Sequence, residues 1–224
     1  MTDRLVLIVG TGDHARVVID LARACGHSLA GCVAPAGEGP TSPVQTVDGV
    51  PVIGSLAGDG SKREWLDGAA TFTVAIGDNE RRRTAFSECL RLGLEAAVLI
   101  HPSATVLGQA TIEPGAQVCA NAVIGLGARV GRDVIINTAA TIDHDNVVDE
   151  HAMIGPGAHL AGRVTVGEGA QIGIGATVRQ GIRIGAWSLV AAGAVVVRDV
   201  PARASVAGVP ASPFTGRATT AQTE

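Results

Sequence analysis

Residues 112–136 read IEPGAQVCANAVIGLGARVGRDVII, and every sixth position of this stretch, beginning with Ile112, is Ile or Val. The same period runs without interruption from Ile100 to Val196. A six-residue period fits neither a 3.6-residue helix nor an alternating strand, and it predicts a parallel β-helix in which three hexads make one coil. Four residues after most aliphatic positions stands a tiny side chain for the inner corner, as at Ala104, Ala110, Ala116, Ala122, Ala128, Ala140, Ala152, Ala158, Ala170, Ala176, Ser188 and Ala194. The period alone does not fix the hand of the coil.

The N-terminal part of the chain follows a different pattern. Residues 4–9 end in the apolar run LVLIV and predict a buried strand, a helical pattern follows from about His14 to Cys25, and Leu29–Val33 reads as a second strand. This strand–helix–strand order favours a parallel sheet. We therefore expect a Rossmann-like α/β domain over residues 1–97, a β-helix over 98–200 and a C-terminal tail over 201–224.

The turn between the first strand and its helix carries a glycine pattern. Gly10, Gly12 and Ala15 match G-x-G-x-x-[GA] at the expected place. Such a turn presents free N–H groups at a helix N-terminus, where an anionic group binds well. The acid that a dinucleotide site requires after the second strand is absent from residues 32–35. A phosphate-bearing ligand other than NAD is therefore expected, with a tight turn that binds nothing as the alternative.

A second strand–turn–helix unit is expected downstream. Thr71–Ile76 predicts a strand, and Asn79–Leu92 predicts a helix whose N-cap is Asp78 or Asn79. Both units would direct their turns to one sheet edge, where ligands bind in open α/β folds. The remaining expectations are a flexible loop at residues 35–48, a short strand at Val50–Ile53, a weak helical turn at Lys62–Leu66, a strand at Leu94–Ile100 and a disordered Thr215–Glu224.

Composition excludes several classes of function. The chain has 224 residues, a net charge of −4 and no extended basic patch, so a nucleic acid is not an expected partner. No apolar segment is long enough to span a membrane, and no signal peptide is predicted. Cys25, Cys32, Cys89 and Cys119 show neither metal-binding spacing nor a disulfide framework. Reduced thiols and a cytoplasmic location are expected.

The repeat has one exception that suggests chemistry. After Ile142 the normally tiny position is Asn146, and the same hexad carries Asp143, His144 and Asp145. Gly162, one full coil further along the chain, would stack beside the histidine and leave it space. Histidine has the pKa that suits a base near neutral pH, and the N–H of Gly162 is a candidate oxyanion donor. An exposed corner histidine without a role is the alternative.

Other charged residues are assigned no role on sequence grounds. The cluster Arg81–Arg83 is interpreted as a solvated helix face. His101 and His151 are expected on the surface or at corners, His159 in a solvent-facing turn, and His27 after a helix end, where a cation suits the dipole.

Three features together resemble the left-handed β-helix sugar acetyltransferases, of the sialic-acid O-acetyltransferase and nucleotide-amino-sugar N-acetyltransferase type. They are the small α/β half, the uninterrupted hexads and a terminal Gly-Val-Pro-Ala. The resemblance implies a left-handed coil, a homotrimer, acetyl-CoA as donor, an N-terminal site for a nucleotide-linked sugar and a setting in glycan biosynthesis. The matching stretches are GTGDHARVV from Gly10, AIGDNE from Ala75, INTAATIDHD from Ile136, GEGAQIGIGA from Gly167 and AGVPA from Ala207.

The resemblance also implies roles for particular residues. His144 corresponds to the family's general base, Asp145 to its acidic partner and Asn137 to a positioning amide. The donor is expected on Gly162 and on the backbones of Ile174 and Ala192, with Met153 standing where the family has a donor-binding histidine. Acidic nucleotide-reading residues of the family align with Ala34 and Pro35, which leaves the nucleotide open. The acceptor positions implied are Gly12, Asp13, His14, Gly77, Asn79 and Glu80.

The donor positions and the base occupy different corners of the coil. Ile174 and Ala192 are separated by three hexads, which is one full coil, and would stack. His144 is offset from both of them by two hexads within a coil. One chain does not easily bring both corners together, so the active site is expected between subunits.

Several functions stay open on sequence grounds. The first is transfer of acetyl to the amino group of a nucleotide-linked sugar, and the second is O-acetylation of a sialic-acid-like or polysaccharide sugar. A non-catalytic scaffold or sensor is a third. A carbonic anhydrase of the β-helix type would need His144, His151 and His159 around a metal, and no metal is expected.

Overall fold

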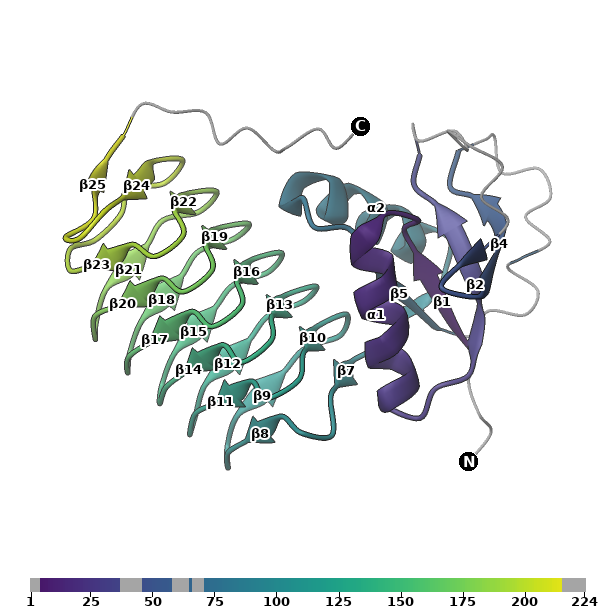
Figure 1. Cartoon of the computed structure of the whole chain (residues 1–224), viewed down its shortest axis with the longest axis horizontal. Coiled ribbons are helices and arrows are strands. Elements are labelled where there is room, and N and C mark those ends of the chain that lie inside the picture. The colour runs from purple at the N-terminus through teal and green to yellow at the C-terminus, as the bar shows by residue number, and fades with distance from the viewer. Residues whose placement is uncertain (1–4, 37–45, 58–64, 66–70, 215–224) are drawn as a thin grey trace.

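The computed structural model describes residues 5–36, 46–57, 65 and 71–214 (Figure 1). Its N-terminal part is a mostly parallel sheet in the order β3-β4-β2-β1-β5-β6, with only β3 antiparallel to its neighbour. This confirms the α/β prediction. The strands are β1 (Val6–Val9), β2 (Leu29–Ala34), β3 (Thr46–Val47), β4 (Val50–Ser55), β5 (Thr71–Val74) and β6 (Glu95–Ala96), and the helices are α1 (Asp13–Ala24) and α2 (Asn79–Arg91).

Two local expectations for this domain need correction, and a third lies almost wholly outside the described residues. The loop expected at 35–48 ends in β3, which pairs with β4 through Val47 and Val50. The strand expected over Leu94–Ile100 is divided into β6 and the first solenoid strand. Of the helical turn expected at Lys62–Leu66, only Trp65 lies within the described residues, and a side chain at Gly54 would collide with its indole.

The rest of the chain forms the predicted parallel β-helix, which is left-handed. Its short strands build three faces, and each strand pairs with the strand at the same place in the next coil, as Gln117 does with Ile135. The first face contains β7 (Leu99–Ile100), β10 (Gln117–Val118), β13 (Ile135–Ile136), β16 (Met153–Ile154), β19 (Gln171–Ile172), β22 (Leu189–Val190), β24 (Ser205–Ala207) and the antiparallel β25 (Ser212–Pro213).

The other two faces complete the triangular coil. The second face contains β8 (Thr105–Val106), β11 (Val123–Ile124), β14 (Thr141–Ile142), β17 (His159–Leu160), β20 (Thr177–Val178) and β23 (Val195–Val196). The third face contains β9 (Thr111–Ile112), β12 (Arg129–Val130), β15 (Val147–Val148), β18 (Thr165–Val166) and β21 (Arg183–Ile184).

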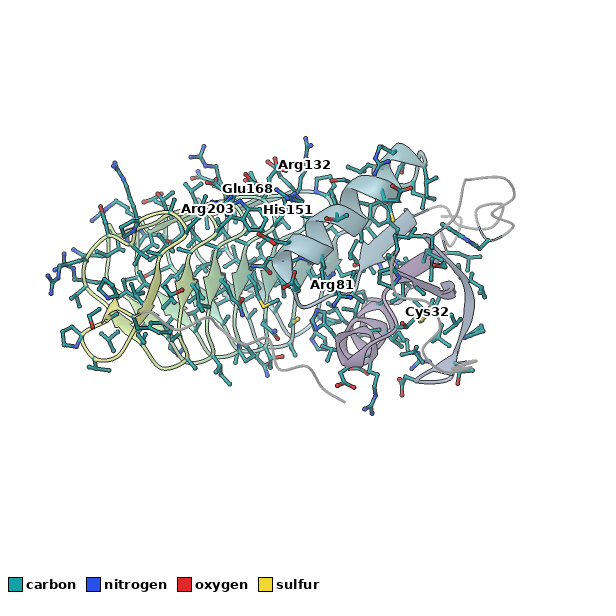
Figure 2. The ribbon with its side chains drawn as sticks, turned by 90° about the horizontal axis from the view of Figure 1, so that it is seen from above. Cys32, Arg81, Arg132, His151, Glu168 and Arg203 are labelled. Atoms are coloured by element: carbon teal, nitrogen blue, oxygen red, sulfur yellow. The ribbon has the colours of Figure 1, made fainter. Side chains whose placement is uncertain are left out.

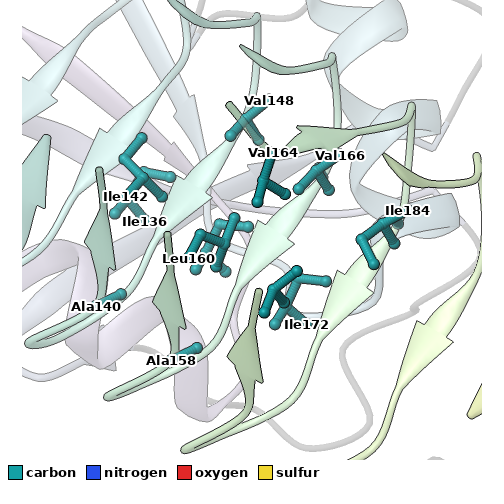
Figure 3. Close-up of a cluster of buried hydrophobic side chains, with 14 of the residues drawn as sticks. Ile136, Ala140, Ile142, Val148, Ala158, Leu160, Val164, Val166, Ile172 and Ile184 are labelled. Carbon is teal, nitrogen blue, oxygen red and sulfur yellow. The ribbon is translucent and has the colours of Figure 1, made fainter. Parts of the chain in front are cut away.

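The hexad positions fill the solenoid interior (Figure 3). Ile136, Ile142 and Ile154 have no exposed surface, and Ala140 and Ala158 close the tight corners between them. Full burial of each large aliphatic side chain stabilises the fold by roughly 1.5–3 kcal/mol. The first coil is the exception: Ile100 and Val106 are 36% and 39% exposed because no coil lies beneath them.

The solenoid extends beyond the boundary expected at residue 200. β24 pairs with β22 in the same register as the coils below, and β25 folds back on it. The predicted tail over 201–224 is therefore wrong for residues 201–214. The disordered segment expected at Thr215–Glu224 lies outside the described residues.

Corners connect the faces, and each takes its name from the face it follows. The first corner includes residues 137–140 and 173–176, the second includes 143–146 and 161–164, and the third includes 131–134 and 149–152. The third residue of most corners has a positive φ, for example +57° at Asp145 and +59° at His151. Asp and Asn tolerate this left-handed conformation better than most residues, and Gly adopts it freely.

Helix α2 lies along the third corner and joins the two domains (Figure 2). We call this contact the docking seam, and it consists of one helix face and one stacked column of corner residues. Arg82 has no exposed surface and forms an ion pair of 3.2 Å with the equally buried Asp133. The helix residues are Asn79, Arg82, Arg83 and Phe86, and the column contains Gly115, Asp133, His151, Gly169 and Trp187.

Each level of the seam has its own contact. Asn79 donates a hydrogen bond of 3.0 Å from Nδ2 to the carbonyl of Gly169. The guanidinium of Arg83 lies 4.7 Å from the centroid of Trp187. A side chain at Gly115 would collide with the ring of Phe86. Side chains at i, i+3, i+4 and i+7 of a helix lie on one face. One face of α2 therefore contacts several successive coils of the solenoid.

The seam overturns one expectation and narrows another. Arg82 is not part of a solvated face: it also donates to the carbonyls of Ile76 and His151 and to the side chain of Asn79. His151 lies at a corner, one of the two places expected for it, and not at the surface, because its Nδ1 lies 2.9 Å from Asp133 Oδ2 and its side chain is 8% exposed. Burial raises the pKa of Asp133 and lowers that of Arg82, and the attraction between the two charges opposes both shifts.

Candidate active site

His144 lies at the second corner and is held there by its own hexad. Its Nδ1 lies 2.9 Å from Asp145 Oδ2, and its backbone N–H donates to Asp143 Oδ1. Because an ionised carboxylate only accepts hydrogen bonds, the proton of the neutral imidazole resides on Nδ1. The lone pair of Nε2 is then free to take a proton. The His144 side chain is 44% exposed, so a substrate can reach it.

Gly162 provides the space that the imidazole occupies. A Cβ at this position would collide with Nε2 and the neighbouring ring carbons of His144. The glycine is itself buried by the ring above it. Its backbone N–H has no acceptor among the hydrogen bonds of the described residues. The stacking inferred from the hexad repeat is thus confirmed.

Asn146 explains the polar position in an otherwise apolar column. Its side chain is fully buried, donates to the carbonyls of Asp143 and Ala161, and accepts from the N–H of Val164. The bond to Asp143 closes the His144 corner itself, and the other two join this corner to the next coil. Asn146 is therefore a support for the corner, and an unpaired buried amide there would cost about 1–3 kcal/mol.

The expected donor positions share the first corner. Ile174 is 59% exposed and Ala192 is also exposed, one coil apart. Their backbone N–H groups donate to no other residue in the described part of the chain. At this second position of a corner the backbone N–H points away from the ladder, and it donates to a side chain only where the preceding residue offers an oxygen, as at Thr138 and His144. Two stacked, free donors result, which suit the amide carbonyls of a long flexible ligand.

Two further predicted residues lie apart from His144. Asn137 begins the first corner, two coils before Gly173, the residue that precedes Ile174, and its Oδ1 accepts from the N–H of Thr138. Met153 lies on the first face and is 9% exposed. No hydrogen bond between described residues links either of them to His144. Within one chain, Asn137 therefore belongs to the donor corner rather than to the base.

The glycine turn of the N-terminal domain adopts the expected geometry. Gly10 has a φ of +141°, and a Cβ there would stand 2.5 Å from the carbonyl oxygen of Ala75. Gly12 is the N-cap of α1 and supplies no side-chain cap. The first helical N–H groups are thus open to a ligand, beside the exposed Asp13.

His14 is more enclosed than its neighbours. Burial, together with the charge of Arg82, lowers the pKa of His14 to about 4, although the nearby side-chain amide of Gln117 acts in the opposite direction. The imidazole is therefore neutral near pH 7, and it cannot offer a positive charge to a phosphate.

The second turn lies at the same sheet edge, because β1 and β5 are parallel neighbours. Gly77 and Glu80 are exposed, and Asp78 caps α2 by accepting from the N–H of Arg81. This confirms the predicted cap. Asn79 is only 6% exposed and its amide is used in the docking seam. Its predicted contact with an acceptor is therefore replaced by a structural one.

A cavity of about 340 Å³ opens at this edge of the sheet. It is lined by Pro35 and Ala36 after β2, and by Glu80, Arg81 and Thr84 of α2. Residues from two turns thus line the same cavity: the turn after β2 and the turn between β5 and α2. In the first of these, Ala34 and Pro35 stand where the resembled family has acids.

The histidines expected of a carbonic anhydrase are divided among different parts of the coil. His144 lies at the second corner, His151 is buried in the docking seam, and His159 lies on the second face with its Nδ1 2.9 Å from Thr141 Oγ1. Among the described residues, no group of three or more His, Cys, Asp or Glu side chains is arranged to hold a metal ion. The same residues include no helix long and apolar enough to cross a membrane.

Comparisons with known proteins agree with this arrangement. Residues 5–89 match the PglD N-terminal domain. A histidine-to-asparagine variant of perosamine N-acetyltransferase from Caulobacter crescentus, in complex with CoA and GDP-perosamine, is 37% identical to this chain. The match covers 95% of this chain and 97% of that one, with a TM-score of 0.85. The chain belongs to the left-handed β-helix sugar acetyltransferases. As a member of this family, it is an acetyl-CoA-dependent acetyltransferase.

Further structures support the same family. The acetyltransferase domain of PglB from Neisseria gonorrhoeae FA1090, in complex with acetyl coenzyme A, is 39% identical over 95% of this chain and 100% of that one, with a TM-score of 0.82. WeeI from Acinetobacter baumannii AYE is 22% identical with a TM-score of 0.80, which shows a shared fold. Among curated proteins, none matches this sequence.

Sequence reasoning about this acetyltransferase missed the docking seam. Its partners lie in successive coils of the solenoid or come from α2, so no local motif contains them. One signal was available: charged or bulky residues at Asp133, His151 and Trp187 occupy a corner position that is often glycine.

Proposed function

We propose that this protein transfers the acetyl group of acetyl-CoA to the amino group of a nucleotide-linked amino sugar, with His144 as general base. The observation that carries the proposal is the His144–Asp145 pair over Gly162. The pair fixes which nitrogen holds the proton, and the other nitrogen lies beside Gly162 on a side chain that is 44% exposed.

The chemistry follows from that geometry. The sugar nitrogen attacks the thioester carbonyl, and His144 Nε2 takes one proton from the nitrogen as the C–N bond forms. Collapse of the tetrahedral intermediate breaks the C–S bond and expels the CoA thiolate, to which the imidazolium returns the proton. Asp145 keeps the Nδ1 proton in place and stabilises the transient cation. A general base of this kind contributes about 10²–10⁴ in rate.

The donor would lie along the first corner. The free N–H groups of Ile174 and Ala192 suit the two amide carbonyls of the CoA arm, and Met153 offers only an apolar side chain near this corner. Gly162 N–H would stabilise the oxyanion. Asn137, at the base of the same corner, would position the acceptor or the donor thioester.

We further propose that the active site is shared by two chains of a homotrimer. The N-terminal domain contacts the first face and the third corner, whereas His144 is at the corner between the second and third faces. The donor corner is separated from His144 by the whole second face. A single copy leaves the acceptor site, the donor corner and the base apart, and a neighbouring copy can bring them together.

The proposed acceptor rests on the relatives. A crystal structure of the C. crescentus enzyme contains CoA and GDP-perosamine, which is a nucleotide-linked sugar. In this chain the glycine turn at Gly12 and Asp13 would bind the diphosphate, and the edge formed by Gly77 and Glu80 would bind the rest of the acceptor.

The cysteines fit a reducing, cytoplasmic setting. None of the four forms a disulfide in the described part of the chain, and burial raises the pKa of Cys32 and Cys119 to about 11, which keeps both thiols protonated and unreactive. We therefore propose that the enzyme works in the cytoplasm on an activated sugar.

The test is release of free CoA thiol from acetyl-CoA in the presence of GDP-, UDP- and CMP-linked 4-amino sugars and their 4-hydroxyl counterparts. Thiol release with an amino sugar, lost in His144→Ala, is expected. Release only with hydroxyl sugars would identify an O-acetyltransferase. No release with any sugar, or full activity of His144→Ala, would overturn the proposal.

A further inference from the structure

One buried polar side chain of the solenoid contacts the N-terminal domain. Gln117 of β10 is 1% exposed, and its Nε2 donates to the backbone carbonyl of Val74 at 2.7 Å and to Thr73 Oγ1 at 3.0 Å. Both partners belong to β5, the neighbour of β1 in the sheet, whose end leads into the second turn of the proposed acceptor edge. Gln117 thus reaches across the domain boundary to the strand beside the glycine turn.

The contact with Val74 fixes the orientation of the amide. A backbone carbonyl only accepts hydrogen bonds, so the Gln117 atom that is bonded to it must be the nitrogen of the NH₂ group. The carbonyl oxygen Oε1 therefore points away from β5. Oε1 is fully buried and accepts no hydrogen bond from the described residues. A buried amide oxygen without a donor is costly, by about 1–3 kcal/mol, which calls for a nearby donor.

His14 supplies the complementary atom. Its Nε2 is the second of the three buried polar atoms without a partner in the described chain. Gln117 lies close enough to interact with the imidazole through its side chain. The residue as a whole is half-buried, and its Nε2 is fully buried. Arg82, the charged residue that acts on this imidazole from α2, disfavours a positive charge on it.

We infer that Gln117 holds His14 as the neutral tautomer with its proton on Nε2, directed at Gln117 Oε1, so that His14 Nδ1 accepts a hydrogen bond from the acceptor. The other tautomer would place two acceptors, Oε1 and a bare Nε2, against each other in a buried site. Gln117 is then a positioning residue, and His14 contacts the ligand.

This assignment changes the chemistry expected of the turn. A neutral imidazole whose free nitrogen is an acceptor repels phosphate oxygens and selects a hydrogen-bond donor, such as a hydroxyl or an amine of the sugar. The diphosphate would then be bound by the backbone N–H groups at the start of α1. The inference rests on the proposed function only in naming a sugar as the ligand, because the tautomer belongs to the free protein.

The first test is ¹⁵N NMR of the full-length protein with labelled histidine, where the two ring-nitrogen shifts identify the tautomer. The chain has six histidines, and His14→Asn assigns the signal. We expect His14 as the neutral Nε2–H form from pH 7 down to pH 5.5. A charged imidazole at pH 7, or the Nδ1–H form, would overturn the inference.

Variants of Gln117 test whether this residue determines the tautomer of His14. Gln117→Leu should abolish the tautomer preference. Gln117→Glu, which keeps the shape and places a carboxylate beside the ring, should make His14 charged at pH 7. Gln171→Leu is the matched control, because Gln171 stands in the same column of the first face but is exposed. An unchanged His14 signal in both Gln117 variants would contradict the proposal.

The kinetic test uses GDP-perosamine as the probe. We expect Gln117→Leu to raise its KM about tenfold, the value of one hydrogen bond to a neutral group. The KM for acetyl-CoA and the inhibition constant of GDP should be unchanged. If GDP binding weakened by the same factor, His14 would contact the diphosphate, and this result would contradict the inference. If the wild type acetylates no amino sugar, the proposed function fails, and the NMR experiment still decides the tautomer.

Discussion

The solenoid contains two histidine–aspartate pairs of the same length and opposite setting. His144 Nδ1 lies 2.9 Å from Asp145, and both side chains are substantially exposed, at 44% and 61%. His151 Nδ1 lies 2.9 Å from Asp133, and their side chains are 8% and 0% exposed. The first pair leaves Nε2 without a hydrogen-bond partner among the described residues, beside Gly162. The second is enclosed by Arg82 and by Phe86, whose ring lies edge-on to the imidazole.

The difference shows that surroundings decide what such a pair can do. An exposed pair at a corner can exchange a proton with a substrate, whereas a buried pair that neutralises Arg82 holds two domains together. The pairs also differ in the chain: Asp145 follows His144 directly, and Asp133 precedes His151 by one full coil. Three experiments separate the two roles and a fourth tests His14, beginning with the largest effect.

The largest effect is expected at the exposed pair. His144→Ala should lower kcat for acetyl transfer by about 10²–10⁴ because the general base is removed. Thermal unfolding should be unchanged, since the side chain is half-exposed. His151→Ala should do the opposite, with a lower Tm and a retained kcat. Loss of kcat in His151→Ala without loss of stability would reverse the assignment of the two pairs.

Arg82→Met removes the α2 cation that forms an ion pair with Asp133 of the buried pair. The change leaves Asp133 buried without its cation, so the free energy of unfolding should fall by about 3–5 kcal/mol in urea titrations. Arg16→Met, at an exposed position of α1, is the control.

A second change separates charge from packing at this site. Adding Asp133→Leu to Arg82→Met removes the unpaired carboxylate, and it should restore part of the lost stability because an apolar replacement of a buried pair is often tolerated. A double variant no more stable than Arg82→Met would contradict the account of the seam.

The third effect concerns pH and His14. Its folded pKa of about 4 lies below the ordinary 6.5, so the unfolded chain binds the proton first as pH falls. Stability from this group is therefore complete above pH 6.5 and declines down to pH 4, by about 1–3 kcal/mol after allowance for partial exposure. Unfolding of wild type and His14→Asn should be compared at pH 7 and pH 4. A pH-independent difference would show that His14 titrates normally.

The smallest effect is expected at Asp145. Its carboxylate is exposed, and an exposed pair is worth about 0–1 kcal/mol, so Asp145→Ala should lower kcat less than tenfold. Asp149→Ala, an exposed acid at the next corner, is a control for general charge effects. A loss at Asp145→Ala as large as that of His144→Ala would mean that the acid does more than orient the ring.

The periodic parts of this molecule were predictable, and the reasons are physical. An inward position every six residues is visible in sequence because each coil repeats one packing requirement, from Val118 to Val196. The acidic neighbours of His144 were visible for the same reason, as a departure from that repeat. The glycine turn at Gly10 was predictable because only glycine fits against the carbonyl of Ala75.

The aperiodic contacts were not predictable. Arg82 looked like one of three solvated arginines, and only the placement of α2 buries it against Asp133 and His151. Asn79 seemed free to bind an acceptor for the same reason. No local sequence pattern indicated a role for Gln117, since Thr73 and His14 lie far from it in the chain. These residues are defined by how two domains meet, which a local pattern does not encode.

The claim that the active site is shared by two chains is tested most directly by mixing two inactive variants. His144→Ala lacks the base, and Ala192→Trp blocks the donor corner. After joint refolding, random assortment should pair an intact base with an intact donor corner on a neighbouring chain at about a quarter of the sites, so about a quarter of wild-type activity should return. If mixed trimers form and stay inactive, each site lies within one chain and the account is wrong.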